Sequence, residues 1–232
     1  MNEHPYEVAW KKYLKSISKS EFERWKKVPE KYIVGLVPML KKRNVKRILD
    51  LGCGLGRHLI FLAKKDFMVV GSDISSTALG IAEKQAKNEK LKNYLLVKHD
   101  ITLFPFPENH FDAVISANVI HHNKLRSIKK TVNEIKRVLK KRGLVIVTLL
   151  SKNDHKYKKG KRVEKDTYDL SHIKGHAEVG VLHHFFGEIE ARRLFSRFKI
   201  LELKELIKEI KPPSSKGIKK SAHWLIIAEK VE

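Results

Sequence analysis

The sequence has few of the residues that crosslink a protein or anchor it to a membrane. Cys53 is the only cysteine among 232 residues, which excludes an intrachain disulfide and a multi-cysteine zinc site and fits a reducing compartment. No run approaches the roughly 18 apolar residues that a membrane-spanning helix needs. The N-terminal residues also lack the apolar core of a signal peptide. We therefore expect a soluble, cytoplasmic protein that makes no contact with a membrane.

Acidic residues are scarce as well. The chain has 26 Asp and Glu against 49 Lys and Arg, a net charge of +23, which suits nucleic acid, an anionic substrate or merely a lysine-rich surface. In the densest basic block, residues 124–142, apolar residues recur at helical spacing from Ile128 to Leu139. This pattern predicts an amphipathic helix with a solvated basic face. The basic residues of 152–165 have no such period and predict a loop.

The length allows one α/β domain with a large core rather than two domains. We assign residues 45–232 to that domain and residues 1–44 to an N-terminal helical extension, in which Pro29 interrupts the helical pattern. The extension carries several aromatic residues among its lysines. Such rings can anchor the extension by packing onto the domain.

The chain is organised around residues 48–58, Ile-Leu-Asp-Leu-Gly-Cys-Gly-Leu-Gly-Arg-His, where an apolar run breaks into three glycines. This pattern predicts a strand, a tight turn and a helix start. Glycine at alternate positions lets a ligand lie against the peptide groups themselves. The pattern departs from the dinucleotide fingerprint G-x-G-x-x-G, because Arg57 occupies the third glycine position and Asp50 would repel a phosphate. An NAD-dependent oxidoreductase is therefore disfavoured.

Three further elements follow the glycines in order. Residues 69–75 predict a strand that ends at Asp73, at the distance from the glycines where a βαβ unit binds ribose. Residues 93–101 predict a strand that ends at Asp100, and residues 110–122 a fourth strand with its loop. Together with Asp-x-Gly-x-Gly-x-Gly, this series resembles the class I S-adenosylmethionine-dependent methyltransferases. Within that class, Gly54-x-Gly56-Arg57-His58 and His184-Phe185-Phe186 most resemble the broad type 11 group.

The resemblance implies S-adenosyl-L-methionine as the cofactor and residues 1–44 as a cover over its pocket. It assigns the ribose hydroxyls to Asp73 and the adenine amine to Asp100. The cofactor-binding residues that it implies are Asp50, Gly52, Cys53, Gly54, Gly56, Arg57, Asp73, Ile74, Asp100, Ile101 and Asn118.

The alternation of strands with helices indicates an α/β fold with a Rossmann-like, doubly wound sheet of seven strands, mostly parallel. The strands are expected at residues 46–51, 69–73, 94–98, 112–116, 144–150, 199–203 and 223–228. We expect Lys140–Gly143 to form the turn before the fifth strand. Only a loop at Pro212–Ser215 separates the last two strands, so the last strand should run antiparallel.

Residues 151–184 are polar, lack a clear period and are long for a connection inside a compact domain. We interpret them as a substrate lid inserted into the domain. Ligands of open α/β sheets bind beyond the carboxyl ends of the strands, which suggests an acceptor pocket made by His121, His122, His183 and His184. A packing or solvent role stays open for each of these histidines.

We expect no metal site, because no pair of these histidines has i,i+4 spacing on a predicted helix. His172 and His176 are four residues apart, but Gly175 lies between them and makes a helix there less favourable, so this pair also does not predict a metal site.

The function that the resemblance implies is transfer of a methyl group by in-line displacement, which requires positioning more than acid–base groups. The basic residues are spread and no separate RNA-binding module is visible, so we favour a small polar or anionic acceptor. Residues 119–122 and 224–230 also resemble wobble-uridine tRNA methyltransferases, which keeps tRNA open as the acceptor. A non-catalytic S-adenosylmethionine-binding protein that partners an active subunit is a further alternative.

Overall fold

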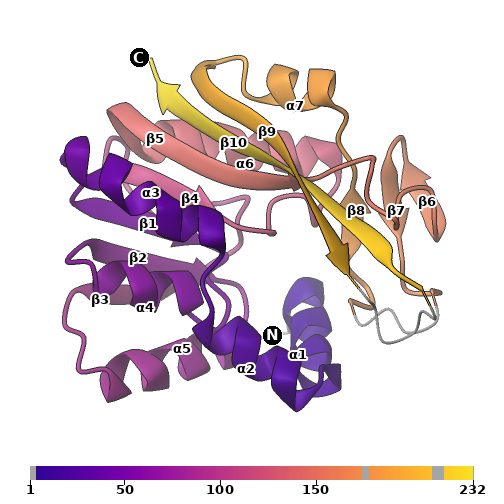
Figure 1. Cartoon of the computed structure of the whole chain (residues 1–232), viewed down its shortest axis with the longest axis horizontal. Coiled ribbons are helices and arrows are strands. Elements are labelled where there is room, and N and C mark those ends of the chain that lie inside the picture. Colours follow the sequence, from indigo (N-terminus) through magenta and orange to yellow (C-terminus); the bar gives the residue numbers. More distant parts are fainter. Residues whose placement is uncertain (1–3, 174–177, 211–216, 232) are drawn as a thin grey trace.

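The computed structural model describes residues 4–173, 178–210 and 217–231 (Figure 1). The helices are α1 (Pro5–Ser16), α2 (Lys19–Lys27), α3 (Lys31–Lys42), α4 (Arg57–Ala63), α5 (Ser76–Asn88), α6 (Leu125–Val138) and α7 (Glu188–Leu194). The strands are β1 (Arg47–Leu51), β2 (Met68–Asp73), β3 (Tyr94–Lys98), β4 (Phe111–Ser116), β5 (Leu139–Leu150), β6 (Lys161–Glu164), β7 (Thr167–Asp169), β8 (Leu182–His184), β9 (Phe198–Ile210) and β10 (Lys219–Lys230). Within these residues, each helix is too short or too polar to cross a bilayer.

The main sheet has seven strands in the order β3-β2-β1-β4-β5-β10-β9. The strands from β3 to β5 pair in parallel, whereas β10 runs antiparallel to both of its neighbours, β5 and β9. This confirms the predicted doubly wound α/β sheet and its antiparallel last strand. The parallel arrangement brings the carboxyl ends of β1, β2 and β4 to one edge of the sheet, at the arrowheads of these strands in Figure 1.

Both faces of the central strands are buried under helices. Ile48 of β1 packs in the apolar cluster that contains Ile33 of α3 and residues of α4, whereas the next residue, Leu49, packs with α6 and α7 on the other face. Burial on both faces explains why β1, β4 and β5 are nearly continuous apolar runs in the sequence. On α6, Ile128 and Ile135 are fully buried, which confirms an amphipathic helix under the basic residues.

The fifth strand begins earlier than predicted. β5 starts at Leu139, so the expected turn at Lys140–Gly143 lies inside the strand. The pairing of β4 with β5 shifts between Phe111 and Ala113, where the additional residues of β5 are accommodated as a bulge. A bulge and a turn use similar residues, because both need a local break in the strand conformation, and the sequence did not distinguish them.

The last two strands are longer than the predicted residues 199–203 and 223–228. β9 and β10 pair with each other from Phe198 with Lys230 to Ile210 with Lys219. The extra length forms a two-stranded ribbon that reaches beyond the main sheet toward β6, β7 and β8 (Figure 1). Much of β9 is exposed or half-buried, so its apolar runs are short. The loop expected at Pro212–Ser215 lies outside the described residues.

The region of residues 151–184 has more regular structure than predicted. β6, β7 and β8 form a separate antiparallel sheet, and the side chains of Tyr168, Leu170 and Phe185 pack with Leu150 into a small core. Strands of three or four residues are too short to give a period in the sequence. His176 and the neighbouring residues 174–177 lie outside the described part of the chain.

Residues 4–42 form three helices, of which α1 docks at the carboxyl end of the sheet. The carboxylate of Glu7 accepts hydrogen bonds from the backbone nitrogen and hydroxyl of Ser76, at 3.2 and 2.8 Å, and pairs with Nζ of Lys98 at 2.8 Å. Glu7 is 8% exposed. One side chain of α1 thus ties that helix to α5 and to the end of β3.

We expect the Glu7 contacts to make stability depend on pH. The hydrogen bonds from Lys98 and then from Ser76 lower the pKa of Glu7 from 4.5 to about 2, so the ionised form stabilises the folded chain above pH 4.5 and this contribution is lost as pH falls toward 2. Urea unfolding should find Glu7→Gln less stable than the unsubstituted protein at neutral pH. The difference should shrink steadily below pH 4.5; a pH-independent difference would contradict the assignment.

Candidate functional site

The glycine loop follows β1 at the carboxyl edge of the sheet. Gly52, Gly54 and Gly56 have φ of 71°, 52° and 89°, a region that glycine adopts without strain. The space around the three glycines differs. A Cβ on Gly52 would lie 2.5 Å from Val119, and one on Gly56 would lie 2.8 Å from Ala82. A Cβ on Gly54 would meet nothing within 4 Å, so Gly54 alone faces open space.

Asp73 at the end of β2 holds this loop in place. Its carboxylate oxygens accept one hydrogen bond from the backbone nitrogen of Gly54 and one from that of Ser75, each at 2.9 Å. Burial raises the pKa of Asp73, and these N–H donors act in the opposite direction. Each carboxylate oxygen can accept a further hydrogen bond, so the side chain can also receive the hydroxyls of a ligand.

The glycine loop and Asp73 border a cavity of about 290 Å³. Of the residues predicted at the cofactor, those that line the cavity are Gly52, Cys53, Gly54, Arg57, Asp73, Ile74, Asp100, Ile101 and Asn118. The remaining two do not: Gly56 faces α5, as described above, and Asp50 lies behind the loop.

Asp50 is 1% exposed, and its Oδ2 has no hydrogen-bond partner among the described residues. Burial raises the pKa of Asp50 to about 7, against the opposing effects of the Leu59 backbone N–H and of Arg57. A buried polar atom without a partner is unusual in a folded protein. Asp50 therefore has an unused acceptor directly behind the glycine loop.

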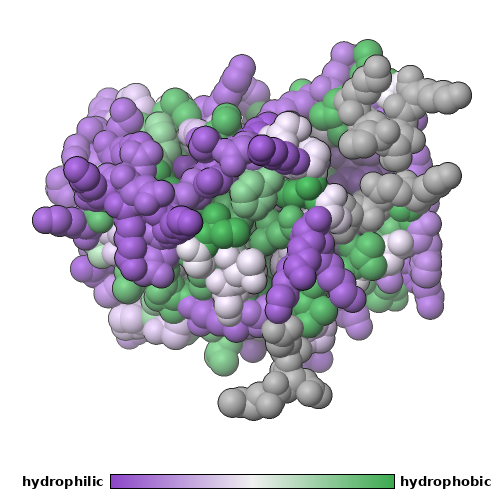
Figure 2. All heavy atoms as spheres, turned by 90° about the horizontal axis from the view of Figure 1, so that it is seen from below, coloured by the Kyte–Doolittle hydropathy of each residue, from purple (hydrophilic) through white to green (hydrophobic). Residues whose placement is uncertain are grey.

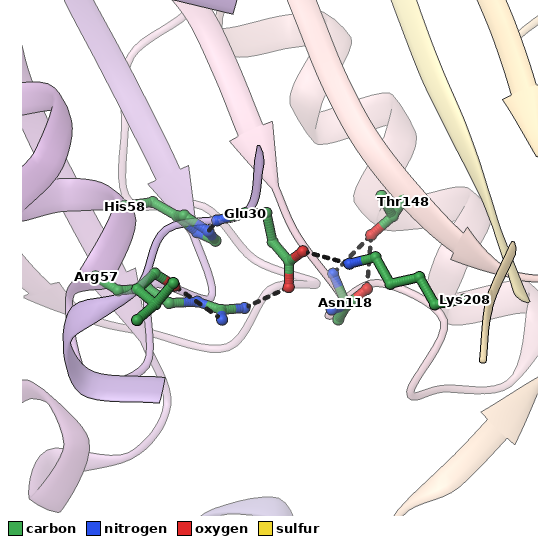
Figure 3. Close-up of polar contacts among 7 residues, drawn as sticks. Glu30, Arg57, His58, Asn118, Thr148 and Lys208 are labelled. Atoms are coloured by element: carbon green, nitrogen blue, oxygen red, sulfur yellow. Dashed lines mark hydrogen bonds and ion pairs between the residues drawn. The ribbon is translucent and has the colours of Figure 1, made fainter. Parts of the chain in front are cut away.

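Arg57 and His58, at the start of α4, bind the segment between α2 and α3 (Figure 3). The carboxylate of Glu30 pairs with Arg57 at 3.3 Å and with Lys208 of β9 at 2.8 Å. The backbone nitrogen of Glu30 donates to Nε2 of His58 at 3.2 Å. Burial lowers the pKa of His58 to about 3, so its ring is neutral and can accept. Arg57 thus has a structural partner that its position in the motif did not reveal.

Asn118 follows β4 and lies across from the glycine loop. Its backbone nitrogen donates to Oγ1 of Thr148 at 2.8 Å, and the Thr148 hydroxyl donates to Oδ1 of Asn118 at 2.9 Å (Figure 3). Asn118 has φ of 60°, which asparagine tolerates better than most residues. These bonds to β5 hold a strained residue of the cavity wall in one conformation.

Aromatic residues of α1 and α2 form the roof of the cavity. Tyr6, Trp10, Tyr13 and Trp25 all line it, and the rings of Trp10 and His122 meet edge to face with centroids 5.3 Å apart. Burial raises the pKa of Tyr6 to about 12, which keeps its hydroxyl protonated. The face of the molecule shown in Figure 2 has apolar residues at its centre, with hydrophilic residues around them.

The far end of the cavity is rich in histidine. His121, His122 and His223 line it together with Lys156 and Glu178. The rings of His121 and His122 have centroids 4.3 Å apart. Burial lowers the pKa of His122 to about 3 and holds that of His121 well below its usual value, so both rings are neutral and can accept hydrogen bonds.

The four histidines of the predicted acceptor pocket are not all brought together. His183 packs edge to face on His122, with centroids 4.7 Å apart. His184 points elsewhere: its Nδ1 lies 2.6 Å from the hydroxyl of Thr167, and its Nε2 lies 3.5 Å from Glu190. Alternation along β8 explains the difference, because neighbouring residues of a strand face opposite sides.

Sequence reasoning missed three residues at this end, Lys156, Glu178 and His223. They are far apart in the chain and belong to no shared motif. His223 lies in β10, which was predicted only as a strand, and Glu178 lies in the region interpreted as a lid. No local pattern brings them to one cavity, because His223 comes from β10 whereas Lys156 and Glu178 come from separate parts of residues 151–184.

Residues 48–143 match the methyltransferase domain family. The chain is 38% identical over half of its length to an uncharacterized protein of Methanocaldococcus jannaschii, of which it covers 47%. It is 24% identical over 69% of its length to a tRNA N(3)-cytidine methyltransferase of Danio rerio, of which it covers 46%. The chain thus spans about half the length of these relatives.

A crystal structure of an S-adenosylmethionine-dependent methyltransferase from Methanosarcina mazei has the same fold. The TM-score is 0.69 at 23% sequence identity, and the match covers 84% of this chain and 97% of the other.

Proposed function

We propose that this chain is a class I S-adenosylmethionine-dependent methyltransferase, as the match of residues 48–143 to the methyltransferase domain supports, and that it transfers a methyl group from S-adenosylmethionine to a small polar or anionic molecule. The observation that carries the proposal is a single cavity with a glycine cradle at one end and buried histidines at the other. The two ends offer separate places for a donor and an acceptor.

The residues at the glycine end fit the cofactor. Gly54 leaves space for a ligand against the backbone, and the Asp73 carboxylate can accept hydrogen bonds from ribose hydroxyls. Asp100 can accept from the adenine amine once its contact with His4, at 3.2 Å, is exchanged. Asp50 does not line the cavity, so its unused buried oxygen would act on the amino acid part through a bridging water. When bound, S-adenosylmethionine supplies a methyl carbon already activated by the sulfonium.

The chain itself contributes positioning and exclusion of water. The roof of Tyr6, Trp10 and Tyr13 closes over the cavity, so that reactants are held in a near-attack arrangement away from solvent. The Nδ1 atoms of His121 and His122 have no hydrogen-bond partner among the described residues, so each can accept a hydrogen bond from the methyl acceptor. Lys156 offers a positive charge to an anionic group of the acceptor.

Burial at the histidine end supports a small acceptor. His121 and His122 are 2% and 8% exposed, so a nucleotide within tRNA would reach them only after α1 moved away. A cavity of about 290 Å³ lies near the lower end of the range for small-molecule sites, roughly 300–1,000 Å³.

We expect labelled S-adenosylmethionine to transfer its methyl group to a component of a small-metabolite extract and not to total tRNA. Transfer to the metabolite fraction should change little with salt, because few exposed phosphates are involved. Label in tRNA that falls steeply with salt and is lost in Lys129→Glu and Lys130→Glu on α6 would establish tRNA as the acceptor instead. Binding of S-adenosylmethionine with label in neither fraction would favour the non-catalytic alternative.

A further inference from the structure

Three side chains of the type that bind metals meet at the histidine end of the cavity. One ring nitrogen each of His122 and His183 and one carboxylate oxygen of Glu178 all lie within 4.8 Å of one another. His122 follows β4, His183 is in β8, and Glu178 shortly precedes that strand. Two imidazoles with one carboxylate are a donor set that holds zinc-class ions in proteins.

The contacts of His183 determine which of its nitrogens faces the cluster. Nδ1 lies 3.0 Å from the carbonyl oxygen of Val181, and because a carbonyl oxygen only accepts, Nδ1 carries a proton. Nε2 lies 2.8 Å from Oε2 of Glu178. In the neutral ring Nε2 is also an acceptor, so a proton must lie between the two atoms. A metal ion bound by both atoms would displace that proton.

The contact of His183 Nδ1 with the Val181 carbonyl also orients the ring of His183 as a metal ligand. Metal-binding histidines characteristically donate their other ring N–H to a backbone carbonyl or a carboxylate, which fixes the tautomer and the ring plane. The bond from Nδ1 to Val181 has this form. His183 is fully buried, and the Glu178 side chain is 15% exposed, so an ion here would be largely withdrawn from solvent.

We propose that His122, Glu178 and His183 bind one divalent ion of the zinc class at the acceptor end of the cavity. Around a tetrahedral zinc with bonds of about 2.0–2.1 Å, ligand atoms lie roughly 3.3 Å apart. The present spacings run from 2.8 Å between His183 and Glu178 up to 4.8 Å, so side-chain movements would open the first pair slightly and close the widest one. The sequence suggested no metal because these ligands share no helix, and the fold brings His122 from the loop after β4 to Glu178 and His183 near β8.

The charges around the cluster identify the ligand that would complete the site. Lys156 lines the same cavity, and its charge opposes that of a cation. Glu178 offsets one unit, so a divalent ion beside Lys156 leaves an excess of positive charge. An acceptor with an anionic oxygen or sulfur balances that excess.

The role of the ion in catalysis rests on the proposed function. Three protein ligands leave the fourth position of a tetrahedral ion open, where a hydroxyl or thiol of the acceptor can bind and lose its proton more readily. The proton is released to water as the acceptor binds. The freed electron pair then forms the bond to the methyl carbon as the bond from that carbon to sulfur breaks, and sulfur keeps that pair.

We expect the full chain, stripped of metal with a chelator, to bind one equivalent of Zn²⁺ in isothermal titration calorimetry. Glu178→Gln and His183→Gln should each weaken that affinity at least tenfold. The matched control is His110→Gln, which removes a histidine at the opposite end of β4; it separates the site from adventitious binding by the other histidines, of which the chain has 12. Co²⁺ should give the intense visible absorption of a tetrahedral site, lost in Glu178→Gln.

Failure of this inference can be told from failure of the proposed function, because binding of S-adenosylmethionine is titrated separately on the same samples. No stoichiometric uptake of Zn²⁺ by protein that binds S-adenosylmethionine would overturn the metal site alone. Equal affinity for Zn²⁺ in Glu178→Gln and His110→Gln would overturn it as well. Circular dichroism spectra that match those of the unsubstituted protein ensure that a loss of affinity reflects lost ligands.

Discussion

Replacing Gly54 by valine should abolish binding of S-adenosylmethionine while the chain stays folded. The added side chain would enter open space, since a Cβ at Gly54 meets nothing within 4 Å, and that space is the cavity bordered by Asp73. A branched residue at φ of 52° also carries backbone strain of order 1–3 kcal/mol. Calorimetric titration should detect no binding at ligand concentrations that saturate the unsubstituted protein.

Two substitutions serve as controls for this result. Gly54→Ala adds less volume and should weaken binding without abolishing it. Gly35→Val places a branched residue in α3, where a Cβ also meets nothing within 4 Å, so it measures the cost of valine away from the cavity. An unchanged dissociation constant in Gly54→Val would mean that the ligand does not lie against the glycine loop.

The parallel half of the sheet was predictable because its physical signals are local. Strands such as β1, β2 and β4 are buried on both faces and therefore appear as apolar runs. Gly52, Gly54 and Gly56 mark the loop because their positive φ values restrict the residue type. Ser75 caps α5, accepting a hydrogen bond from the backbone nitrogen of Ala78, and serine before an apolar period signals a helix start.

The histidine end was only half predictable, because its residues meet through tertiary contacts. His121 and His122 could be placed from the rule that ligands bind beyond the carboxyl ends of strands. His183 and His184 looked equivalent in sequence, but alternation along β8 sends one toward His122 and the other toward Thr167. The strand itself is three residues long, too short to reveal which residue faces inward.

The three glycines show the same limit within a single motif. All of them were expected at the cofactor, yet Gly56 is required by its close approach to Ala82 of α5 and Gly52 by its approach to Val119. Their spacing in the sequence indicates a tight turn, but it does not indicate which glycine faces open space. Only the packing of α5 and of the loop after β4 shows that Gly54 is the one of the three where a Cβ would meet open space.

Asp73→Ala should weaken binding of S-adenosylmethionine by roughly 10- to 100-fold. Hydrogen bonds to a charged group contribute about 1.5–3 kcal/mol, and the substitution removes the carboxylate that is placed to accept from the ribose. It also removes the bonds to the backbone nitrogens of Gly54 and Ser75, both at 2.9 Å. Part of the loss therefore comes from a loosened glycine loop.

Asp112→Ala is the matched control for that second effect. Asp112 also receives backbone N–H groups with its carboxylate, from Lys46 at 2.9 Å and from Arg47 at 2.7 Å, but it lies near the start of β4, at the opposite edge of the sheet. It should lower the free energy of unfolding and leave the dissociation constant unchanged. If Asp73→Ala changed stability alone, as Asp112→Ala should, β2 would end at a structural carboxylate and the ribose would bind elsewhere.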